Sequence, residues 1–355
     1  MPAGEVPVTK SRGLPLRPPY PPMEAQSVEA IPQGKGWQYE PKWDGFRCIA
    51  FRDGDDVYLQ SKAGQPLARY FPEVVKNLQR LAADRFVIDG ELVIRVGSEL
   101  SFDDLLMRIH PAASRVKLLS RETPSTFIVF DLLVDSDGRL LTSLPLAERR
   151  PLLERFAQGN FKKGGGIRLS RASAQRAVVD RWFASVGGAL DGVIAKRTDL
   201  DYRSGDRSGA QKVKKLRTAD CVVGGFRYAS SSKVIGSLLL GLYDDAGLLN
   251  HVGFTSGLKT DQRKELVKKL TPLIAPPGFT GRAPGGPSRW STERTEQWEP
   301  LKPELVVEVS YDHVSGERFR HGTRLLRWRP DKAAKQCTME QLNLTTTASA
   351  LSLST

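Results

Sequence analysis

The sequence changes character near Thr218, and this change restricts the folds that the chain can adopt. Before that point, segments with helical spacing alternate with short apolar runs, such as 86–94 and 125–134, that predict buried strands. After it, short strands dominate and one helix interrupts them. Five strands and one helix within about 120 residues are typical of a small barrel of the OB type. The sequence therefore predicts two domains, as its length of 355 residues also suggests.

The part before Thr218 contains signals for a hairpin, several helices and a further strand. Asp53-Gly54 lies between two alternating runs and predicts a tight turn. Residues 71–84 have helical spacing, and Ser101 is suited to the N-cap of a helix. Further helices are expected at 101–109, 114–120, 146–157 and 173–186, and a strand at 190–197. In the second part, strands are expected at 220–228, 236–244, 249–255, 304–312 and 324–330, and the helix at 260–274.

The charge and the cysteine content restrict the class of protein. A net charge of +13 makes a polyanion, with nucleic acid first, the leading candidate partner, although a solvated basic surface would look the same. Cys48, Cys221 and Cys337 lie far apart without metal-ligand spacing, which favours a reducing compartment. No apolar stretch has the length of a signal peptide or a membrane span. We therefore expect a cytoplasmic protein without membrane contact.

The common signatures of nucleotide and metal binding are missing from the sequence. No G-x-x-x-x-G-K-[ST] occurs, and no strand leads into G-x-G-x-x-G. The four histidines do not form H-x-x-x-H, and no Cys-x-x-Cys is present. A nucleotide, if the protein handles one, must be bound in another way.

The segment YEPKWDGFR places Lys42 directly before Trp-Asp-Gly. An amine attacks phosphorus or carbonyl carbon only when it is neutral, and burial beside Trp43 with Arg47 nearby would lower the pKa of the lysine. Asp44-Gly45 suits a tight turn that could hold the amine at the floor of a pocket. The alternative is an ordinary solvated lysine beside a turn.

Other expected strands carry charged or aromatic residues that a plain core does not need. Asp89-Gly90-Glu91 lies in an apolar run, where a carboxylate costs several kcal/mol unless it is paired. Phe130 could form the wall of a base pocket or simply pack in the core. Asp191 could hold a ligand or begin a turn. Lys212 and Lys214 share one face of a strand, where they could bind a phosphate or guard an exposed edge.

The order of these segments resembles that of the covalent nucleotidyltransferases, the superfamily of ATP-dependent DNA ligases, RNA ligases and capping enzymes. Within it, the sequence from about Trp37 to Leu342 is most similar to the short bacterial DNA ligases of the "ligase C" type. The segments that carry the resemblance are KWDGFR (42–47), SKAG (61–64), FVIDGELV (86–93), FIVFDLL (127–133), LDGVIAK (190–196), KVKKLRTADCVVGGF (212–226) and RWRPDK (327–332).

The resemblance implies an α+β fold with two domains. A Pro-rich lead-in would occupy residues 1–36, followed at 37–218 by an adenylation domain with antiparallel sheets and helices. An OB-fold β-barrel would occupy 219–342, and a disordered tail 343–355. It also implies that the barrel swings between steps, so we expect a hinge near Leu216–Asp220.

The resemblance implies roles around a bound nucleotide. Lys42 would be the catalytic nucleophile that forms a phosphoramidate with AMP. Glu40 would lie near the adenine edge and Phe130 would stack on the adenine. Arg47 would hold the ribose end of the site, and Glu91 would accept a hydrogen bond from a ribose hydroxyl.

It implies further roles around the phosphates and the metal. Asp191, with Glu91, would bind the catalytic metal, although most relatives have Glu in place of Asp191. Lys212 and Lys214 would neutralise the α-phosphate. Lys62 stands where Arg is usual, so it keeps the charge but loses the two-pronged grip on a 5′-phosphate.

From the barrel, Arg329, Asp331 and Lys332 would close over ATP and orient the pyrophosphate. The resemblance thus implies an enzyme that seals DNA nicks in repair with ATP and Mg²⁺ or Mn²⁺. Its partner would be nicked double-stranded DNA, with other repair proteins as further candidates. We expect a monomer in the bacterial cytoplasm, associated with the nucleoid. The rivals are an RNA-sealing or capping enzyme and a non-catalytic OB-type module that binds single strands and does not need Lys42.

Overall fold

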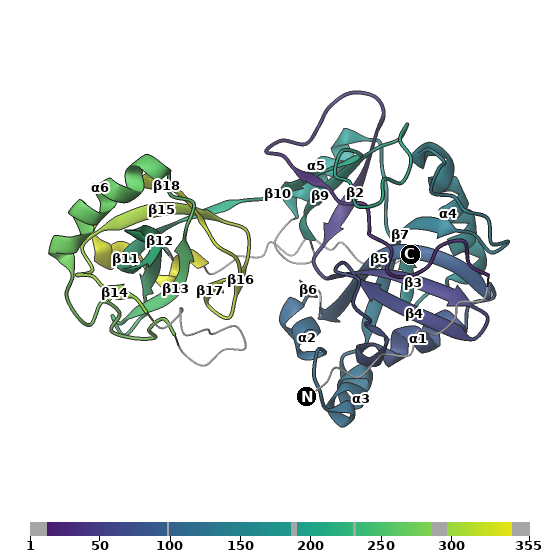
Figure 1. The fold of residues 1–355 in the computed structure, drawn as a ribbon, viewed down its shortest axis with the longest axis horizontal. Helices are drawn as coiled ribbons and strands as arrows, with labels where there is room; N and C mark the ends of the chain where they lie inside the picture. The colour runs from purple at the N-terminus through teal and green to yellow at the C-terminus, as the bar shows by residue number, and fades with distance from the viewer. Residues whose placement is uncertain (1–12, 98, 186–189, 230–231, 286–296, 343–355) are drawn as a thin grey trace. The chain divides into compact units, whose positions relative to one another are not determined.

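The computed structural model describes residues 13–97, 99–185, 190–229, 232–285 and 297–342 (Figure 1). The chain divides into two compact units, each with its own core. Among the described residues, the first comprises those up to Lys214 and the second those from Lys215 onward. The tail expected at 343–355 lies outside the described residues.

The first unit contains a six-stranded sheet in the order β4-β3-β5-β7-β8, with β6 paired to β5. Neighbouring strands are antiparallel, except that β7 and β8 are parallel. The hairpin predicted at Asp53-Gly54 is confirmed, and Gly54 has a φ of +65° there. The strands are β3 (Phe46–Asp53), β4 (Asp56–Ser61), β5 (Arg85–Val96), β6 (Glu99–Leu100), β7 (Ser125–Val134) and β8 (Ile167–Leu169).

A second, four-stranded sheet of the first unit has the order β1-β10-β9-β2. Its strands are β1 (Gln26–Ser27), β2 (Trp37–Trp43), β9 (Leu190–Arg197) and β10 (Ala210–Lys214). β2 and β10 pair antiparallel with β9, and β1 pairs parallel with β10. The described part of the lead-in therefore adds a short strand to this sheet.

Asp44-Gly45 connects the two sheets rather than the strands of one hairpin. β2 before it belongs to the four-stranded sheet, and β3 after it belongs to the six-stranded sheet. A Cβ on Gly45 would lie 2.1 Å from the carbonyl oxygen of Leu92, so the crossing needs a residue without a side chain.

The α-helices of the first unit lie where the sequence predicted helices, with one correction, whereas the short 3-10 helix at Ala68–Tyr70 was not predicted. The predicted N-cap is confirmed, because the backbone N–H of Asp104 donates to Oγ of Ser101. The helix predicted over 71–84 ends at Gln79, since the guanidinium of Arg52 binds carbonyl groups at that end, including those of Leu78 and Ala83. The helices are η1 (Ala68–Tyr70), α1 (Pro72–Gln79), α2 (Phe102–Met107), α3 (Ala113–Glu122), α4 (Leu146–Asn160) and α5 (Arg176–Ala184).

The second unit is built on an antiparallel sheet in the order β13-β12-β11-β15-β18. These are the five strands that the sequence predicted, and α6 confirms the predicted helix. A short strand, β14, pairs with β11, and β16 pairs with β17. The elements are β11 (Arg217–Ala229), β12 (Ser232–Tyr243), β13 (Leu249–Thr255), α6 (Thr260–Leu270), η2 (Thr271–Leu273), β14 (Glu299–Pro300), β15 (Val306–Tyr311), β16 (Val314–Ser315), β17 (Arg318–Phe319), β18 (Arg324–Trp328), η3 (Ala334–Gln336) and η4 (Met339–Leu342).

All three cysteines are buried in the cores of the two units. Burial raises the pKa of Cys48 and of Cys221 well above its ordinary value, and raises that of Cys337 to about 11. The thiols therefore stay protonated near neutral pH. Among the described residues, no helix is long and apolar enough to cross a membrane.

Candidate active site

Three strands of the four-stranded sheet bring Lys42, Asp191 and Lys214 together. Lys42 of β2 and Lys214 of β10 both face Gly192 of β9 in the strand register. Nζ of Lys42 donates a hydrogen bond to Oδ2 of Asp191, and Nζ of Lys214 lies 3.3 Å from the same oxygen. A Cβ on Gly192 would lie 2.0 Å from the carbonyl oxygen of Val213, so this close pairing requires glycine.

Further cations surround this group. Burial lowers the pKa of Lys212, and repulsion from Lys42, Lys214, Lys62 and Arg207 lowers it further. Cations held this close together repel one another and form a natural site for phosphate groups. β1 pairs with β10 at Gln211 and Lys212, so this part of β10 is not an exposed edge.

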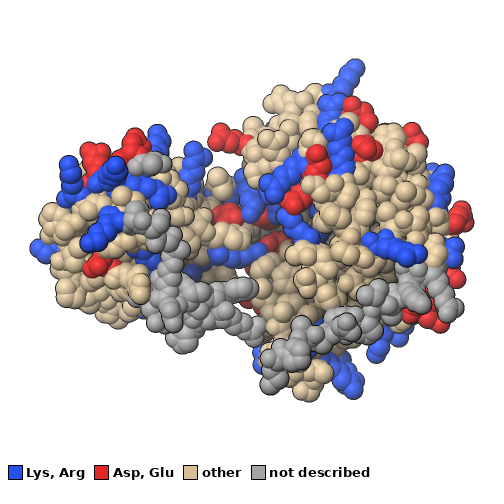
Figure 2. Space-filling view, in the orientation of Figure 1, with Lys and Arg blue, Asp and Glu red and all other residues tan. Residues whose placement is uncertain are grey.

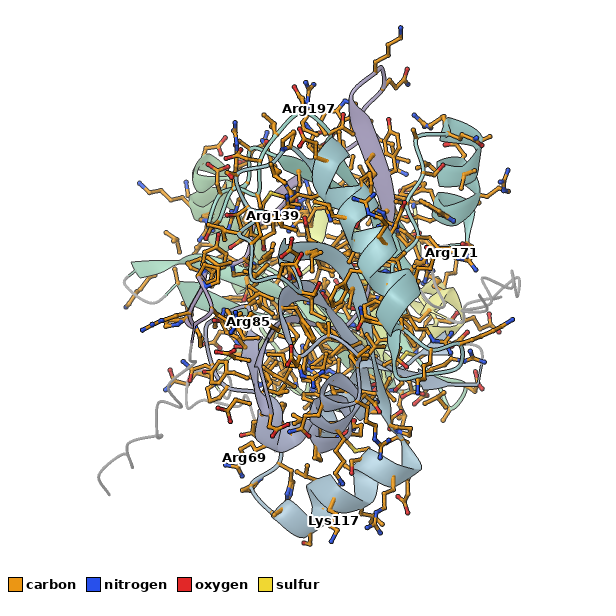
Figure 3. The ribbon with its side chains drawn as sticks, turned by 90° about the vertical axis from the view of Figure 1, so that its right-hand side faces the viewer. Arg69, Arg85, Lys117, Arg139, Arg171 and Arg197 are labelled. Atoms are coloured by element: carbon orange, nitrogen blue, oxygen red, sulfur yellow. The ribbon has the colours of Figure 1, made fainter. Side chains whose placement is uncertain are left out.

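Other cations of the first unit are more widely spaced. Figure 3 labels six of them, which lie apart from one another over the visible face: Arg69, Arg85, Lys117, Arg139, Arg171 and Arg197. Two of these pair with an acidic residue close in sequence, Arg139 with Asp135 and Arg197 with Asp199. Figure 2 likewise shows basic side chains on the visible surface of each unit. The group around Lys212 is therefore distinguished by its density and not by charge alone.

Lys62, which follows β4, is exposed and forms an ion pair with Glu24 of the lead-in at 2.9 Å. Arg207 approaches the same carboxylate at 3.1 Å. The hydrogen bond from Lys62 lowers the pKa of Glu24, so this carboxylate is ionised near neutral pH. The lead-in is thus tied to two of the cations that surround Lys212.

Glu91 lies on β5 opposite Arg47 of β3. Burial raises the pKa of this carboxyl to about 7, against the opposing effects of the charges on Arg47 and Lys42. Near neutral pH the group can therefore either donate or accept a hydrogen bond. This suits a carboxyl that contacts a hydroxyl group of a ligand.

Arg47 is fixed by a carboxylate that the sequence analysis did not assign. Its Nε and Nη2 donate to the two oxygens of Asp89 at 2.6 and 2.5 Å. Burial disfavours the charge on Arg47, but Asp89 outweighs this effect and raises the pKa of the guanidinium. The hydroxyl of Tyr202 also donates to Asp89, at 2.6 Å. The signal in the sequence was the Asp of Asp89-Gly90-Glu91 within an apolar strand.

The ring of Phe130 lies beside two cations. Cζ of Arg47 is 4.7 Å and Nζ of Lys196 is 4.6 Å from its centroid. Lys196 of β9 also forms a buried ion pair with Glu40 of β2, at 2.9 Å. The sequence analysis missed Lys196, although a lysine near the end of the apolar strand 190–197 was a usable signal. An aromatic ring beside polar groups that can bond a base edge suits a purine.

In the second unit, the residues of RWRPDK gather around a carboxylate at the start of β11. Nη1 of Arg329 lies 2.9 Å and Nζ of Lys332 lies 2.8 Å from oxygens of Asp220. Asp331 is exposed, and its hydrogen bond from Arg329 lowers its pKa to about 2. Gln341 pairs with both backbone groups of Asp220. Asp220 is thus an organising residue that the sequence analysis did not select.

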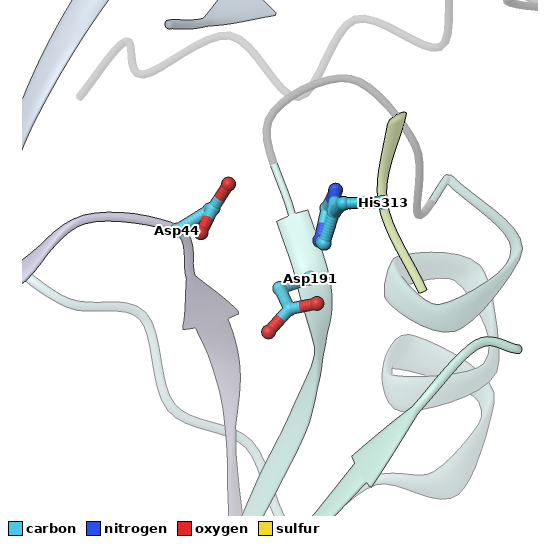
Figure 4. A group of neighbouring side chains, drawn as sticks. All are labelled: Asp44, Asp191 and His313. Carbon is cyan, nitrogen blue, oxygen red and sulfur yellow. The ribbon is translucent and has the colours of Figure 1, made fainter. Parts of the chain in front are cut away.

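Asp44 and Asp191 offer carboxylate oxygens within 4.8 Å of each other (Figure 4). Hard divalent cations such as Mg²⁺ prefer oxygen ligands of this kind, so these residues fit such an ion. Asp44 was not among the ligands expected from the sequence, which were Asp191 and Glu91. His313, also drawn in Figure 4, belongs to the second unit.

Comparison with known families decides the class of the protein. The family described as "ATP dependent DNA ligase domain" matches residues 22–214, and "ATP dependent DNA ligase C terminal region" matches 231–332. The chain belongs to the ATP-dependent DNA ligases. DNA ligase C2 of Mycolicibacterium smegmatis is 44% identical to this ligase over 346 residues, 93% of this chain and 96% of that protein. DNA ligase C of Mycobacterium tuberculosis is 43% identical over 351 residues, 95% and 97% of the two chains.

Solved structures support the same fold. A structure of a Lig E DNA ligase matches this ligase with a TM-score of 0.56 and 16% identity, over 87% of this chain and 99% of that one. Together with the two family matches, this confirms the α+β fold with an adenylation domain and an OB-fold domain. The resemblance to the ligase C type, read from the motifs, is likewise confirmed.

Proposed function

We propose that this ligase seals nicks in double-stranded DNA through an AMP group carried covalently on Lys42. The observation that supports this role most directly is the hydrogen bond of Lys42 to Asp191 within a dense group of cations. An ordinary solvated lysine would not form a hydrogen bond with a buried carboxylate beside three or more further positive charges.

In the first step, Nζ of Lys42 bonds to the α-phosphorus of ATP, and the bond from that phosphorus to the pyrophosphate oxygen breaks. Asp191 orients the amine through Oδ2 and can accept the proton that Nζ loses. Lys212 and Lys214 neutralise the charge on the phosphoryl oxygens. Catalysis of this kind depends on positioning and on charge neutralisation.

In the second step, an oxygen of the 5′-phosphate at the nick attacks the AMP phosphorus, and the bond to Nζ of Lys42 breaks. In the third, the 3′-hydroxyl oxygen attacks the 5′-phosphate, and AMP leaves with the oxygen of the broken anhydride. Lys62 and Arg207 are placed to receive the nick phosphate in exchange for Glu24. A divalent cation, Mg²⁺ or Mn²⁺, held by Asp44 and Asp191 would supply further neutralisation of the phosphate oxygens.

Other residues of the first unit bind the adenine and the ribose of the nucleotide. Phe130 stacks on the adenine, and Glu40 with Lys196 bonds the base edge. Arg47 and Glu91 bind the ribose. From the second unit, the residues that Asp220 organises (Arg329, Asp331 and Lys332) act on the departing pyrophosphate.

The remaining proposals concern the organisation and setting of the protein. We assign residues 37–218 to adenylation and 219–342 to the OB-fold domain, with a hinge near Leu216–Asp220. The protein acts as a monomer on nicked DNA in the bacterial cytoplasm, at the nucleoid, in repair. Other repair proteins are candidate partners.

Intact mass of the purified protein tests the central step. With ATP and Mg²⁺ we expect the wild type to gain the mass of one AMP and Lys42→Ala to gain none, while Lys76→Ala, on an exposed face of α1, gains it as the wild type does. An AMP adduct on Lys42→Ala would overturn the assignment. So would a wild type without an adduct, after pyrophosphate treatment to clear any AMP already present.

A second experiment distinguishes a DNA ligase from an RNA-sealing or capping enzyme. The adenylated protein is offered nicked DNA and nicked RNA, and the first step is repeated with GTP. We expect the protein to seal DNA and to use ATP. A preference for nicked RNA would indicate an RNA-sealing enzyme, and a preference for GTP would indicate a capping enzyme.

A further inference from the structure

Tyr202 completes a closed circuit of hydrogen bonds around Arg47. Its hydroxyl donates to Oδ2 of Asp89 at 2.6 Å and accepts from the backbone N–H of Met23 at 3.0 Å. The carbonyl oxygen of Met23 in turn accepts from Nη2 of Arg47 at 3.1 Å, and the same guanidinium donates to Asp89. Residues from the lead-in, from β3 and β5, and from the loop after β9 therefore meet at one guanidinium.

The circuit determines which part of Arg47 remains for a ligand. The N–H of Nε and the N–H groups of Nη2 donate to the two oxygens of Asp89 and to the carbonyl oxygen of Met23. In the described part of the chain, none of the hydrogen bonds of Arg47 uses Nη1. The guanidinium also lies over the ring of Phe130, with Cζ 4.7 Å from the centroid. The donors of Nη1 are thus the part of Arg47 that remains for a nucleotide beside Phe130.

Tyr202 is held firmly, so its hydroxyl has a fixed position. The residue is 4% exposed, its ring stacks on that of Tyr20 at 6.3 Å between centroids, and Cζ of Arg149 lies 5.7 Å from its ring centroid. Its backbone N–H donates to the carbonyl oxygen of Thr142 at 2.8 Å. Burial and the charge of Asp89 raise the pKa of Tyr202 well above its ordinary value. The hydroxyl therefore keeps its proton and remains a donor near neutral pH.

The lead-in is also held, on both sides of Met23. The backbone N–H of Gly205 donates to the carbonyl oxygen of Pro22 at 3.2 Å, and that of Glu24 donates to the carbonyl oxygen of Asp206 at 2.8 Å. These bonds join the lead-in to the loop that carries Tyr202. The carbonyl group that Arg47 contacts is therefore fixed before a ligand arrives, and preorganised contacts lose less entropy on binding.

Pairing with Asp89 alone would leave Arg47 less well oriented. The last torsion of an aspartate side chain is soft, so a carboxylate can turn and take a bound guanidinium with it. The bond from Tyr202 to Oδ2 of Asp89 opposes this rotation, and the bond from Arg47 to Met23 fixes the guanidinium at a second point. Misplacing a positioning group by about 1 Å can slow a reaction by about 100-fold.

We propose that Tyr202, together with the backbone of Met23, is a positioning residue that orients Arg47 so that Nη1 meets the nucleotide during AMP transfer to Lys42. The inference rests on the proposed function, which places Arg47 at the ribose. Tyr202 acts through Arg47 and not on the reacting atoms. The lead-in, for which the sequence indicated no role, is then a working part of the nucleotide site.

Single-turnover AMP transfer in four proteins tests whether the hydroxyl acts through Arg47. The proteins are the wild type, Tyr202→Phe, Arg47→Lys and the variant with both substitutions. Tyr202→Phe removes one oxygen and keeps the stacked ring. Arg47→Lys keeps a positive charge beside the buried Asp89 but removes the two-pronged guanidinium. Urea unfolding checks that all four proteins are folded.

We expect Tyr202→Phe to slow AMP transfer by about 10-fold when position 47 is Arg, but by less than about 2-fold when it is Lys, because no guanidinium is then left to orient. Equal slowing in both backgrounds would overturn the proposal, since the hydroxyl would then act on the fold in general. An unchanged rate in both backgrounds would overturn it as well.

The matched control is Tyr39→Phe. Tyr39 is also 4% exposed, and its hydroxyl donates to the carbonyl oxygen of Pro32, so this substitution removes the same atom and another bond to the lead-in. It should lower the urea midpoint, as Tyr202→Phe does, but leave AMP transfer unchanged with either residue at position 47. A loss of rate equal to that of Tyr202→Phe would overturn the proposal, because loosening the lead-in at any point would then be sufficient.

Two measurements distinguish this inference from the proposed function. If the wild type gains an AMP and Tyr202→Phe gains it at the same rate, the proposed function stands and the positioning role fails. If the wild type gains no AMP, the proposed function fails, and the affinity of the same four proteins for ATP decides the positioning role. A loss of affinity on Tyr202→Phe that is absent from the Arg47→Lys background would support that role, and equal losses or none would overturn it.

Discussion

Single residues of the site owe their properties to partners far away in the sequence. Burial and nearby charges set the pKa of Glu91 at about 7, although its sequence neighbours are apolar. The Arg47–Asp89 pair spans 42 positions, and Tyr202 joins it from 113 positions away from Asp89. A sequence shows each of these residues only beside its chain neighbours. The motifs could therefore identify Glu91 and Arg47, but not Tyr202, which sits in a polar loop without a distinctive pattern.

The raised pKa of Glu91 makes stability depend on pH. Between about pH 4.5 and 7 the folded protein holds a proton that the unfolded chain has lost, so stability falls as pH rises through this window. The effect is at most ~3.5 kcal/mol, at ~1.4 kcal/mol per pKa unit. We expect Glu91→Gln to lack this fall, as measured by urea unfolding at about pH 5 and about pH 8.

Glu99→Gln on the exposed strand β6 is the matched control and should keep the fall seen in the wild type. If the stability of the wild type and that of Glu91→Gln fell equally with rising pH, the proton would be held by a group other than Glu91.

At the scale of elements, apolar runs predicted the strands well because a buried strand is a short apolar run bounded by turn residues. The five strands of the second unit and β5 and β7 of the first were recognised in this way. The pairing was not predictable, since Asp44-Gly45 looks like a hairpin turn but separates two sheets. The end of α1 was also missed, because the residue that ends it, Arg52, belongs to β3.

The close contact of β9 with β10 leads to a prediction. Gly192→Ala would place a Cβ 2.0 Å from the carbonyl oxygen of Val213 and force the two strands apart. We expect a loss of about 2 kcal/mol or more in the free energy of unfolding, together with slower AMP transfer to Lys42. Denaturant unfolding and the rate of adduct formation measure the two effects.

Gly159→Ala in α4 is the control, because a Cβ there meets nothing within 4 Å. It should leave AMP transfer unchanged and stabilise the protein by up to about 1 kcal/mol, since alanine favours helix. Equal behaviour of the two variants would contradict the requirement for glycine at 192.

Asp220 leads to a second prediction at this scale. Asp220→Asn leaves Arg329 and Lys332 without the carboxylate that orients them. We expect AMP transfer from ATP to slow by about 10- to 100-fold, because misplaced groups lose most of their catalytic effect. Sealing of DNA that already carries AMP at the nick should change little, because no pyrophosphate leaves in that step.

The comparison variant is Glu308→Gln, which breaks the pair of Glu308 with the exposed side chain of Arg327. It should affect neither rate, since exposed pairs contribute little. If Asp220→Asn slowed the sealing of adenylated DNA as much as it slowed AMP transfer from ATP, the substitution would have damaged the second unit in general.

For the whole molecule, a net charge of +13 bears on the DNA steps more than on the ATP step. Each phosphate contact adds about −0.9 to the log–log salt slope. We expect affinity for nicked duplex to fall steeply between about 50 and 200 mM salt, while AMP transfer from ATP changes far less. Binding assays measure the affinity for DNA across that range of salt, and adduct formation measures AMP transfer. An equal dependence of the two on salt would contradict a DNA-binding role for the basic surface.

The buried thiols of the two units also make the protein a convenient subject for fluorescence experiments. Cys48, Cys221 and Cys337 are inaccessible, and their raised pKa values keep them in the unreactive thiol form. A cysteine introduced on the surface of each unit can therefore be labelled with a maleimide dye without removing the native ones. Energy transfer between the dyes would then follow the distance between the units in real time as ATP and nicked DNA are added.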